Sequence, residues 1–462
     1  MSTWFVDVEL EGHRADVVVD AGVVTRVERV GAHRPAPSDT VIRADGGWLL
    51  PGLHDHHLHL LSLAAALTSV DCSPAAAPGL TELGVALRAH DHPDGWVRGV
   101  GHHDAATGPL DRHVLDRLVP DRPVRVQHRG GALWVLNSVA LRHVADLLDD
   151  SGDVERDDRG EPTGRLWRYD TRLAPGLPTR RPDLAAVGRE LRALGVTGVT
   201  DATPDLADAT TALLAQAVTD GRLPVDVTVL GGGPSPPAPL TAGPAKIMLR
   251  DHDLPSLAQL VQVISDQRAV GRAVAVHCVT VESIVLTLAA IDQVGAVPGD
   301  RIEHAAVLPT PLLGELKRLG LRAVIQPDLL RTRGREYLAE VDPAELPDLC
   351  PHRRLLSAGI PTTCSSDAPF GCLDPWQVVA TASTRRTQDG RVIGAAESVE
   401  PAVALAGYLS SAGEPGGAPR RIRVGARADL LLLAVGRADA LEHPRRELVR
   451  ATLRGEDLRL AD

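Results

Sequence analysis

Residues 53–59 gather side chains that are able to bind a metal ion. The stretch PGLHDHHLHL contains four histidines and one aspartate within this span. Imidazole nitrogens and carboxylate oxygens are ligands that suit zinc and other divalent first-row metals. The motif therefore indicates a metal site, and the alternative is a histidine-rich turn that binds nothing.

Two His-x-His pairs compete within this motif. Because side chains alternate along a strand, Asp55, His57 and His59 share one face, whereas His54 and His56 share the other. Active sites of α/β barrels lie at the carboxyl ends of their strands. This position favours the later pair, His57 and His59, as the metal ligands.

Four more candidate residues lie at the ends of other strand-like runs, namely Lys246, His277, His304 and Asp367. A single histidine at a strand end is more often a core residue than a ligand. The strand ends of a barrel, however, all meet at one mouth. Several imidazoles and one carboxylate there predict a site for a divalent metal, zinc above all, with one or two ions per chain and a position left for water.

Strand-like apolar runs alternate with helical segments from residue 53 onward, which is typical of a parallel sheet closed by crossover helices. The eight runs are residues 53–59, 196–202, 224–230, 245–251, 273–279, 301–307, 322–327 and 361–367. We therefore predict an α/β fold in which residues 53–399 form a TIM (β/α)8 barrel. The first gap is too long for one helix, so residues of about 62–190 are expected to be an inserted subdomain.

Both chain ends show the alternation of short strands. FVDVEL and DVVVD lie near one end, and RIRVGARADLLLLAV lies near the other. Neither set can bury both of its faces alone. We expect residues 1–52 and 400–462 to form one small β-domain, a β-sandwich.

Composition excludes several classes of function. The net charge of −11 and the lack of clustered Lys and Arg argue against nucleic-acid binding. MSTWFVDVEL lacks a basic segment leading into an apolar run, and no stretch of about 18 apolar residues occurs, so neither secretion nor membrane insertion is expected. Five cysteines without CxxC spacing fit reduced thiols in a cytoplasmic enzyme. A small-molecule substrate is expected, and a homo-oligomer is compatible with the sequence.

Taken in order, these motifs resemble the amidohydrolase superfamily, and most closely its branch of N-substituted-formamide-deformylase-like hydrolases. The resemblance covers nearly the whole chain. Its landmarks are PGLHDHHLHL, WVRGVGHHD, VLNSVAL, AKIM, VAVHC, RIEHAAVL, VIQPDLL, LLSAGIPTTCSSDAPF and VGARADLLLL. The resemblance implies six metal-site residues. They are His57, His59, His277, His304, Asp367 and Lys246, the last as a carboxylated lysine that bridges two metals.

Two departures from the branch lie near the substrate rather than the metals. The branch carries Asp-Gly shortly after the bridging lysine and Gly-Asp shortly after the fifth-strand histidine. This chain has LRDHD after Lys246, and Cys278, Val279 and Thr280 after His277. The metal chemistry therefore carries over, whereas a specific substrate does not.

The implied reaction is hydrolysis of a C–N bond in an amide, a formamide or a cyclic amide of a small molecule by metal-activated water. Asp367 is the predicted catalytic residue, because it can take a proton from that water and pass it to the leaving nitrogen. Arg331 and Arg333 follow the seventh strand and are candidates for binding a substrate carboxylate. A solvated loop is the alternative for these arginines.

Two other functions compete with the amide hydrolase. A mononuclear deaminase on the same barrel usually has a Glu three residues after the fifth-strand histidine, but here that position is Thr280 and the nearest Glu is Glu282. Lys246 also favours the binuclear hydrolase. A non-catalytic assembly protein is disfavoured, because a scaffold does not need a complete set of ligands.

Overall fold

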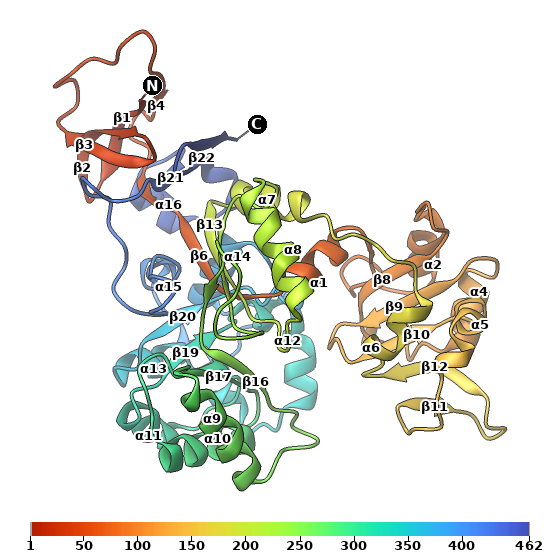
Figure 1. The fold of residues 1–462 in the computed structure, drawn as a ribbon. Helices are drawn as coiled ribbons and strands as arrows, with labels where there is room; N and C mark the ends of the chain where they lie inside the picture. The colour runs from red at the N-terminus through yellow and green to blue at the C-terminus, as the bar shows by residue number, and fades with distance from the viewer. Residues whose placement is uncertain (1, 462) are drawn as a thin grey trace. The chain divides into compact units, whose positions relative to one another are not determined.

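The computed structural model describes residues 2–461, which divide into two compact units (Figure 1). Unit 1 comprises the residues up to Leu60 and from Leu184 onward, and unit 2 comprises Leu61–Asp183. Each unit has its own sheets and its own buried core, and each is described separately below.

Each of the eight predicted runs contains a strand of unit 1. These strands are β6 (Leu53–Leu58), β13 (Val196–Asp201), β14 (Asp226–Val229), β16 (Ala245–Met248), β17 (Val274–Cys278), β18 (Arg301–His304), β19 (Arg322–Ile325) and β20 (Thr362–Cys364). A two-residue strand that was not predicted, β15 (Thr241–Ala242), follows β14. The strands form two parallel sheets, with the orders β15-β14-β13-β6 and β16-β17-β18-β19-β20.

Backbone hydrogen bonds join the two sheets at both ends of their strand order. The Asp367 N–H donates to the His57 carbonyl at 2.8 Å, which connects the segment after β20 to β6. The Lys246 N–H donates to the Leu230 carbonyl at 3.0 Å, which connects β16 to the residue after β14. The predicted α/β class is confirmed.

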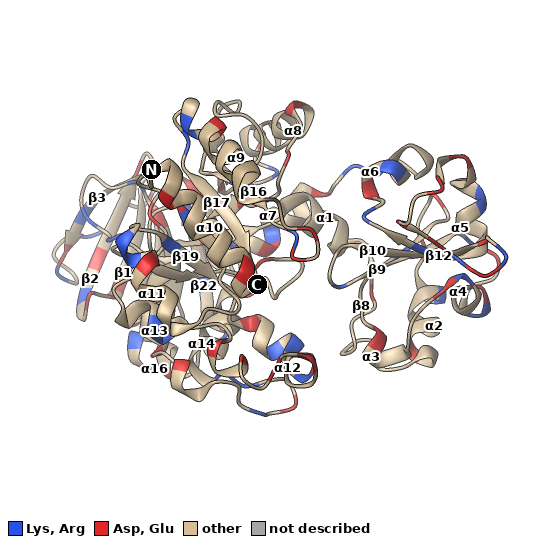
Figure 2. Cartoon of the chain, turned by 90° about the horizontal axis from the view of Figure 1, so that it is seen from below, with Lys and Arg blue, Asp and Glu red and all other residues tan. Residues whose placement is uncertain are grey.

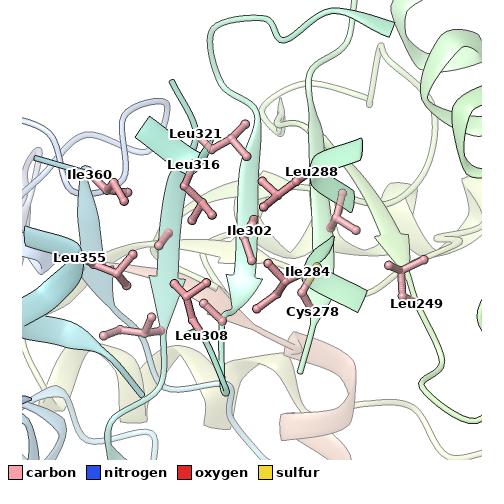
Figure 3. Packing of buried hydrophobic residues seen from close by; sticks show 14 of the residues in the cluster. Leu249, Cys278, Ile284, Leu288, Ile302, Leu308, Leu316, Leu321, Leu355 and Ile360 are labelled. Atoms are coloured by element: carbon pink, nitrogen blue, oxygen red, sulfur yellow. The ribbon is translucent and has the colours of Figure 1, made fainter. Parts of the chain in front are cut away.

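Helices connect and cover these parallel strands. They are α7 (Leu184–Ala193), α8 (Asp208–Thr219), α9 (Leu257–Ala269), α10 (Val281–Val294), α11 (Leu313–Arg318), α12 (Asp328–Glu340), α13 (His352–Ser357), α14 (Pro375–Thr384), α15 (Pro401–Tyr408) and α16 (Arg437–Glu442). Short 3-10 turns lie at Thr310–Leu312, Leu346–Asp348, Ala395–Glu397 and Arg446–Leu448. Helix α10 begins with a capping box in which Thr280 and Ser283 bond each other's backbone N–H groups. Figure 3 shows Ile302 of β18 packed among Leu316 of α11 and Ile284 and Leu288 of α10.

The strands at the two chain ends form two further four-stranded sheets. One has the order β3-β2-β1-β4 and the other β23-β22-β21-β5. Their bounds are β1 (Thr3–Leu10), β2 (His13–Asp20), β3 (Val23–Glu28), β4 (Thr40–Arg43), β5 (Leu49–Pro51), β21 (Asp429–Leu433), β22 (Val449–Arg454) and β23 (Asp457–Leu460). Phe5 and Val17 from the first sheet share a buried cluster with Leu432 and Leu453 from the second. Both chain ends therefore contribute to one core.

Unit 2 contains a six-stranded sheet with the order β11-β12-β10-β9-β8-β7. Its strands are β7 (Val70–Asp71), β8 (Val97–His102), β9 (Val124–His128), β10 (Leu133–Leu136), β11 (Val154–Arg156) and β12 (Pro162–Trp167). Its helices are α2 (Leu80–Ala89), α3 (Asp104–Thr107), α4 (Arg112–Leu118), α5 (Ser138–His143) and α6 (Asp170–Leu173), with 3-10 turns at Ala145–Leu147 and Ala174–Gly176. Helix α1 (Leu60–Leu67) lies at the boundary of the units. Separate apolar clusters contain Val97, Val124 and Val135 on one face and Trp134 and Leu136 on the other.

The surface of the chain carries charges of both signs. Figure 2 shows acidic and basic residues interspersed over each unit rather than gathered in one region. Among residues 2–461, no helix combines the length and apolar character needed to cross a bilayer. All five cysteines are free thiols, and only Cys372 is partly exposed.

Candidate metal centre

His57, His59 and Asp367 form the centre of the site. His57 belongs to β6, His59 follows it, and Asp367 lies three residues after β20. Each offers one ligand atom, and these atoms all lie within 4.8 Å of one another. The Asp367 Oδ1 atom is 3.3 Å from His59 Nε2 and 3.5 Å from His57 Nε2. One carboxylate oxygen and two imidazole nitrogens thus face a common point, as ligands of one cation do.

The other three predicted ligands adjoin this group. The His304 ring centroid is 4.9 Å from that of His57 and 4.4 Å from that of His277. The Lys246 Nζ atom is 3.4 Å from His57 Nε2. Side chains from β6, β16, β17, β18 and the segment after β20 therefore lie in one cluster, in which Lys246 and His277 are half-buried and the others are buried. We call these six residues the ligand cluster.

Unusual backbone conformations bring two members into the cluster. His304 has a φ of 75° and Asp367 a φ of 53°, both in the left-handed region that side chains other than glycine rarely adopt. In the register of the sheet, Glu303 pairs with His277 and His304 pairs with Cys278. Regular alternation would direct Glu303 and His304 to opposite faces, and the left-handed turn at His304 interrupts that alternation. Such strain costs about 1–3 kcal/mol and is found mostly at functional sites.

Glu303 is a functional residue that the sequence analysis missed. Its carboxylate accepts a short hydrogen bond from His57 Nδ1 through one oxygen, and a bond from Arg301 Nε at 2.5 Å through the other. The side chains of Arg301, Glu303 and His57 are each at most 1% exposed. Because Nδ1 of His57 carries the donated proton, its Nε2 lone pair is free to bind a metal. The available signal was an acidic residue between Ile302 and the candidate ligand His304 in a strand-like run.

Hydrogen bonds also fix the Nδ1 atoms of two other rings. His59 Nδ1 lies 3.1 Å from Thr203 Oγ1, and His304 Nδ1 lies 2.7 Å from Gln326 Oε1. Gln326 donates in turn to Ser365 Oγ at 2.9 Å. His277 differs, because its Nδ1 is buried and has no hydrogen-bond partner within residues 2–461. The rings of His57, His59 and His304 are oriented by hydrogen bonds, and His277 adds an unpaired imidazole nitrogen. Together these nitrogen donors fit a divalent cation.

The protonation states of the cluster favour metal binding. Burial lowers the pKa of His57 to about 4, and it lowers the pKa of His277 and His304 to about 3. All three imidazoles are therefore neutral at pH 7, which is the form that binds a metal. Burial opposes the ionisation of Asp367, but the hydrogen bond from His59 and the neighbouring imidazoles outweigh it and hold the pKa of Asp367 below its ordinary value. Burial also lowers the pKa of Lys246.

His54 and His56 are hydrogen-bonded away from the cluster. His54 Nε2 lies 2.9 Å from Thr200 Oγ1, and His56 Nε2 lies 3.0 Å from Ser410 Oγ. Their own ring centroids are 4.6 Å apart. This arrangement agrees with the alternation expected along β6, in which the earlier pair faces away from His57.

The two candidate arginines lie on helix α12, so the alternative of a solvated loop is wrong. Arg331 donates to both carboxylate oxygens of the buried Asp328, through Nε at 2.7 Å and Nη2 at 3.1 Å. Arg333 donates through Nη2 to the Phe370 carbonyl at 2.9 Å. The Phe370 ring centroid is 5.4 Å from that of His59. Arg331 thus has an internal partner, whereas Arg333 bonds the backbone of a residue beside the cluster.

Comparisons with known proteins identify the family of this chain. Residues 40–457 match the model of the Amidohydrolase family. The N-substituted formamide deformylase of Arthrobacter pascens is 27% identical, over 92% of this chain and 90% of that protein. The putative amidohydrolase YtcJ of Bacillus subtilis (strain 168) is 24% identical, over 82% of each. The structure of an uncharacterized metal-dependent hydrolase from Pyrococcus horikoshii OT3 is similar in fold, with a TM-score of 0.74, 18% identity and coverage of 94% of this chain and 97% of that one. The chain belongs to the Amidohydrolase family and is a metal-dependent hydrolase of carbon–nitrogen bonds.

Proposed function

We propose that the ligand cluster is the active site of an enzyme that hydrolyses the amide, formamide or cyclic amide bond of a small molecule. The observation that carries the proposal is the convergence of His57, His59 and Asp367, whose ligand atoms lie within 4.8 Å of one another. The cluster offers neutral nitrogen donors and an anionic oxygen donor, a combination that suits zinc. We expect one or two ions per chain.

In this proposal a bound divalent cation supplies Lewis acidity and lowers the pKa of water. The protein's own contribution is proton transfer by Asp367, whose carboxylate is ionised and lies beside two imidazoles. Asp367 takes the proton released when water adds to the carbonyl carbon, and it delivers that proton to the leaving nitrogen. The C–N bond breaks, and the products are a carboxylic acid and an amine. No nucleophilic serine or cysteine is required.

Lys246 is proposed to be carboxylated and to bridge two metals. Its amine is buried and its pKa is lowered, so it loses its proton more easily than an exposed lysine. A neutral amine can add to carbon dioxide with loss of a proton, and the product is an anion with two oxygen donors. The alternative is that Lys246 simply pairs with a carboxylate such as Asp201. Asp201, however, already accepts the backbone N–H groups of Leu60 and Thr203 at 2.8 and 2.9 Å. The contact of Lys246 with His57 instead supports a role at the metal centre.

The finer architecture is also part of this proposal. We propose that the parallel strands within residues 53–399 form a TIM barrel, because backbone hydrogen bonds connect β6 with the segment after β20 and β16 with the residue after β14. We further propose that residues 1–52 and 400–462 form the β-sandwich domain, and that about 62–190 are an insertion. The free thiols support a cytoplasmic location.

N-substituted formamides and other N-acyl amines are the proposed substrates. The deformylase of Arthrobacter pascens supports this class. The sequence departures after Lys246 and His277 argue against assuming that this chain acts on the same formamide as that deformylase. One of the departing residues, Thr280, donates to Asp251 at 2.7 Å and caps α10. The same observation disfavours a deaminase, because Thr280 occupies the position of the expected Glu. The nearest acid, Glu282, is exposed in the first turn of α10.

Product analysis tests the proposal. Metal content of the purified protein is measured, and the enzyme is offered N-formyl and N-acyl amines, cyclic imides and aminopurines. Metal-dependent release of a carboxylic acid and an amine in equal amounts is expected. Stoichiometric ammonia from an aminopurine, with no turnover of any amide, would establish the deaminase instead.

A further inference from the structure

Unit 2 places two arginines against one tryptophan, and the charge of a third, Arg180, acts on both. Arg98 of β8 and Arg125 of β9 are direct partners in the parallel register. Side chains alternate along both strands, so these arginines lie on the face opposite to Val97 and Val124, which belong to an apolar core. Trp134 of β10 belongs to the other cluster of the sheet. The guanidinium carbon of Arg98 is 5.4 Å from the centroid of the Trp134 ring, and that of Arg125 is 4.8 Å away.

Several donors of these arginines lack acceptors. Arg180 binds both oxygens of Asp94 at 2.7 and 2.8 Å, and the Trp96 carbonyl at 2.9 Å, but its Nη1 is buried and unpaired. The Nε atom of Arg98 is also buried and unpaired. Within residues 2–461, the guanidinium groups of Arg98 and Arg125 have no hydrogen-bond or ion-pair partner.

The two nearby carboxylates, Asp94 and Asp170, offset the charge of the three cations only in part. Asp94 is held by Arg180, and Asp170 accepts a hydrogen bond from Trp134 Nε1 at 2.6 Å. Burial, followed by the charges of Arg98 and Arg180, lowers the pKa of Arg125 to about 10. Half-buried cations normally have partners, because removing a charge from water is costly. Packing against Trp134 offsets part of this cost, at about 0.5–1 kcal/mol per cation–π contact, but it leaves the N–H donors unused.

We propose that Arg98, Arg125 and Arg180 form a binding site for the carboxylate or phosphate group of a small molecule. Guanidinium groups bind such oxyanions through paired N–H donors with strong, charge-assisted hydrogen bonds. Trp134 holds Arg98 and Arg125 on the sheet, and Asp94 holds Arg180. The site belongs to unit 2 alone, and it uses no residue of the ligand cluster.

Thermal unfolding of the full-length, metal-loaded enzyme tests the proposal. The Tm is measured against increasing inorganic phosphate, and separately against acetate, with chloride used to keep the ionic strength constant. Wild type is compared with Arg98→Gln, Arg125→Gln and the control Arg142→Gln. Arg142 is exposed on α5 of the same unit. Any phosphate that binds at the metal centre is common to all four proteins, so the differences between them report on the arginine site.

For wild type and Arg142→Gln, the Tm is expected to rise once phosphate exceeds its Kd, and then to grow with the logarithm of the phosphate concentration. In Arg98→Gln and Arg125→Gln about tenfold more phosphate should be needed for the same rise in Tm over the value in chloride, because a charge-assisted hydrogen bond is lost. A rise in Tm with phosphate but not with acetate would indicate a phosphoryl ligand. An equal rise with acetate would indicate a carboxylate ligand. The proposal is overturned if the Tm of wild type rises with neither anion, or if both site variants show the wild-type rise in Tm at every concentration. A lower Tm in chloride with an unchanged response to phosphate would reduce the arginines to packing partners of Trp134. If one site variant fails to fold, the other decides.

Discussion

Replacing Glu303 by glutamine should weaken metal binding without removing a metal ligand. The carboxylate of Glu303 is the shared partner of His57 and Arg301, and all three side chains are at most 1% exposed. The amide oxygen of glutamine can still accept the hydrogen bond from His57 Nδ1–H, so the ring keeps its orientation while the negative charge is lost. Loss of a carboxylate that supports a ligand histidine typically lowers metal affinity about 10–100-fold. Arg301 would also become an unpaired buried cation, at a cost of about 3–5 kcal/mol in the free energy of unfolding.

The assay for Glu303→Gln measures the Kd for zinc of metal-free protein by competition with a chelator, together with urea unfolding. Glu397→Gln is the matched control, because Glu397 is a buried carboxylate whose ion pair is with Arg354 rather than with the ligand cluster. The control should lose stability and keep the wild-type Kd. Equal zinc affinities for Glu303→Gln and Glu397→Gln would refute the idea that Glu303 supports the metal through His57.

Three further predictions follow from the same geometry. His57→Ala should lose metal and activity. His54→Ala should keep its metal and lose about 1–3 kcal/mol of stability, because its hydrogen bond to the Thr200 hydroxyl is removed. Metal analysis that shows the reverse would mean that the strand register is wrong by one residue. Lys246→Ala should hold one metal or fewer where wild type holds about two, with activity partly restored by short carboxylic acids; two tightly bound metals and unchanged turnover would exclude a bridging role. Burial keeps the pKa of His54 and His352 at about 3, below about 6.5 in the unfolded chain. The unfolded state therefore binds more protons, and the stability from each residue is present above pH 6.5 and falls by about 2 kcal/mol at pH 5; identical urea midpoints at pH 7 and pH 5 would contradict this.

Most of the parallel strands could be predicted because strands covered on both faces are nearly continuous apolar runs. Such short runs can be recognised in the sequence. The ligand candidates followed from the same reading, because each lies at or just after the end of a run. The two-residue strand at Thr241–Ala242 has no such run and was missed. Helix α12 was also missed, although Asp328 and Arg331 have the spacing of an ion pair on a helix.

Glu303 was missed for a different physical reason. Alternation is the only guide to side-chain direction that a sequence offers, and it assigns Glu303 and His304 to opposite faces. The left-handed φ of His304 is a local departure that only the surrounding packing maintains. His304 is not a glycine, and only a few per cent of other residues have a positive φ, so its residue type did not predict one. The residue that supports His57 could therefore be found only once the fold had placed β18 against β6.

The strain at His304 and Asp367 and the neutrality of the imidazoles serve the same end. Each left-handed residue lies directly at a ligand position, and its conformation is held by neighbours, as in the hydrogen bond from Asp367 N–H to the His57 carbonyl. A ligand held in place in advance loses little conformational freedom when it binds. Burial has already removed the protons that would otherwise compete for the nitrogens of His57 and His304. The ligand side chains are thus oriented, and the imidazoles deprotonated, when the chain folds. Neither change has to take place when the cation binds.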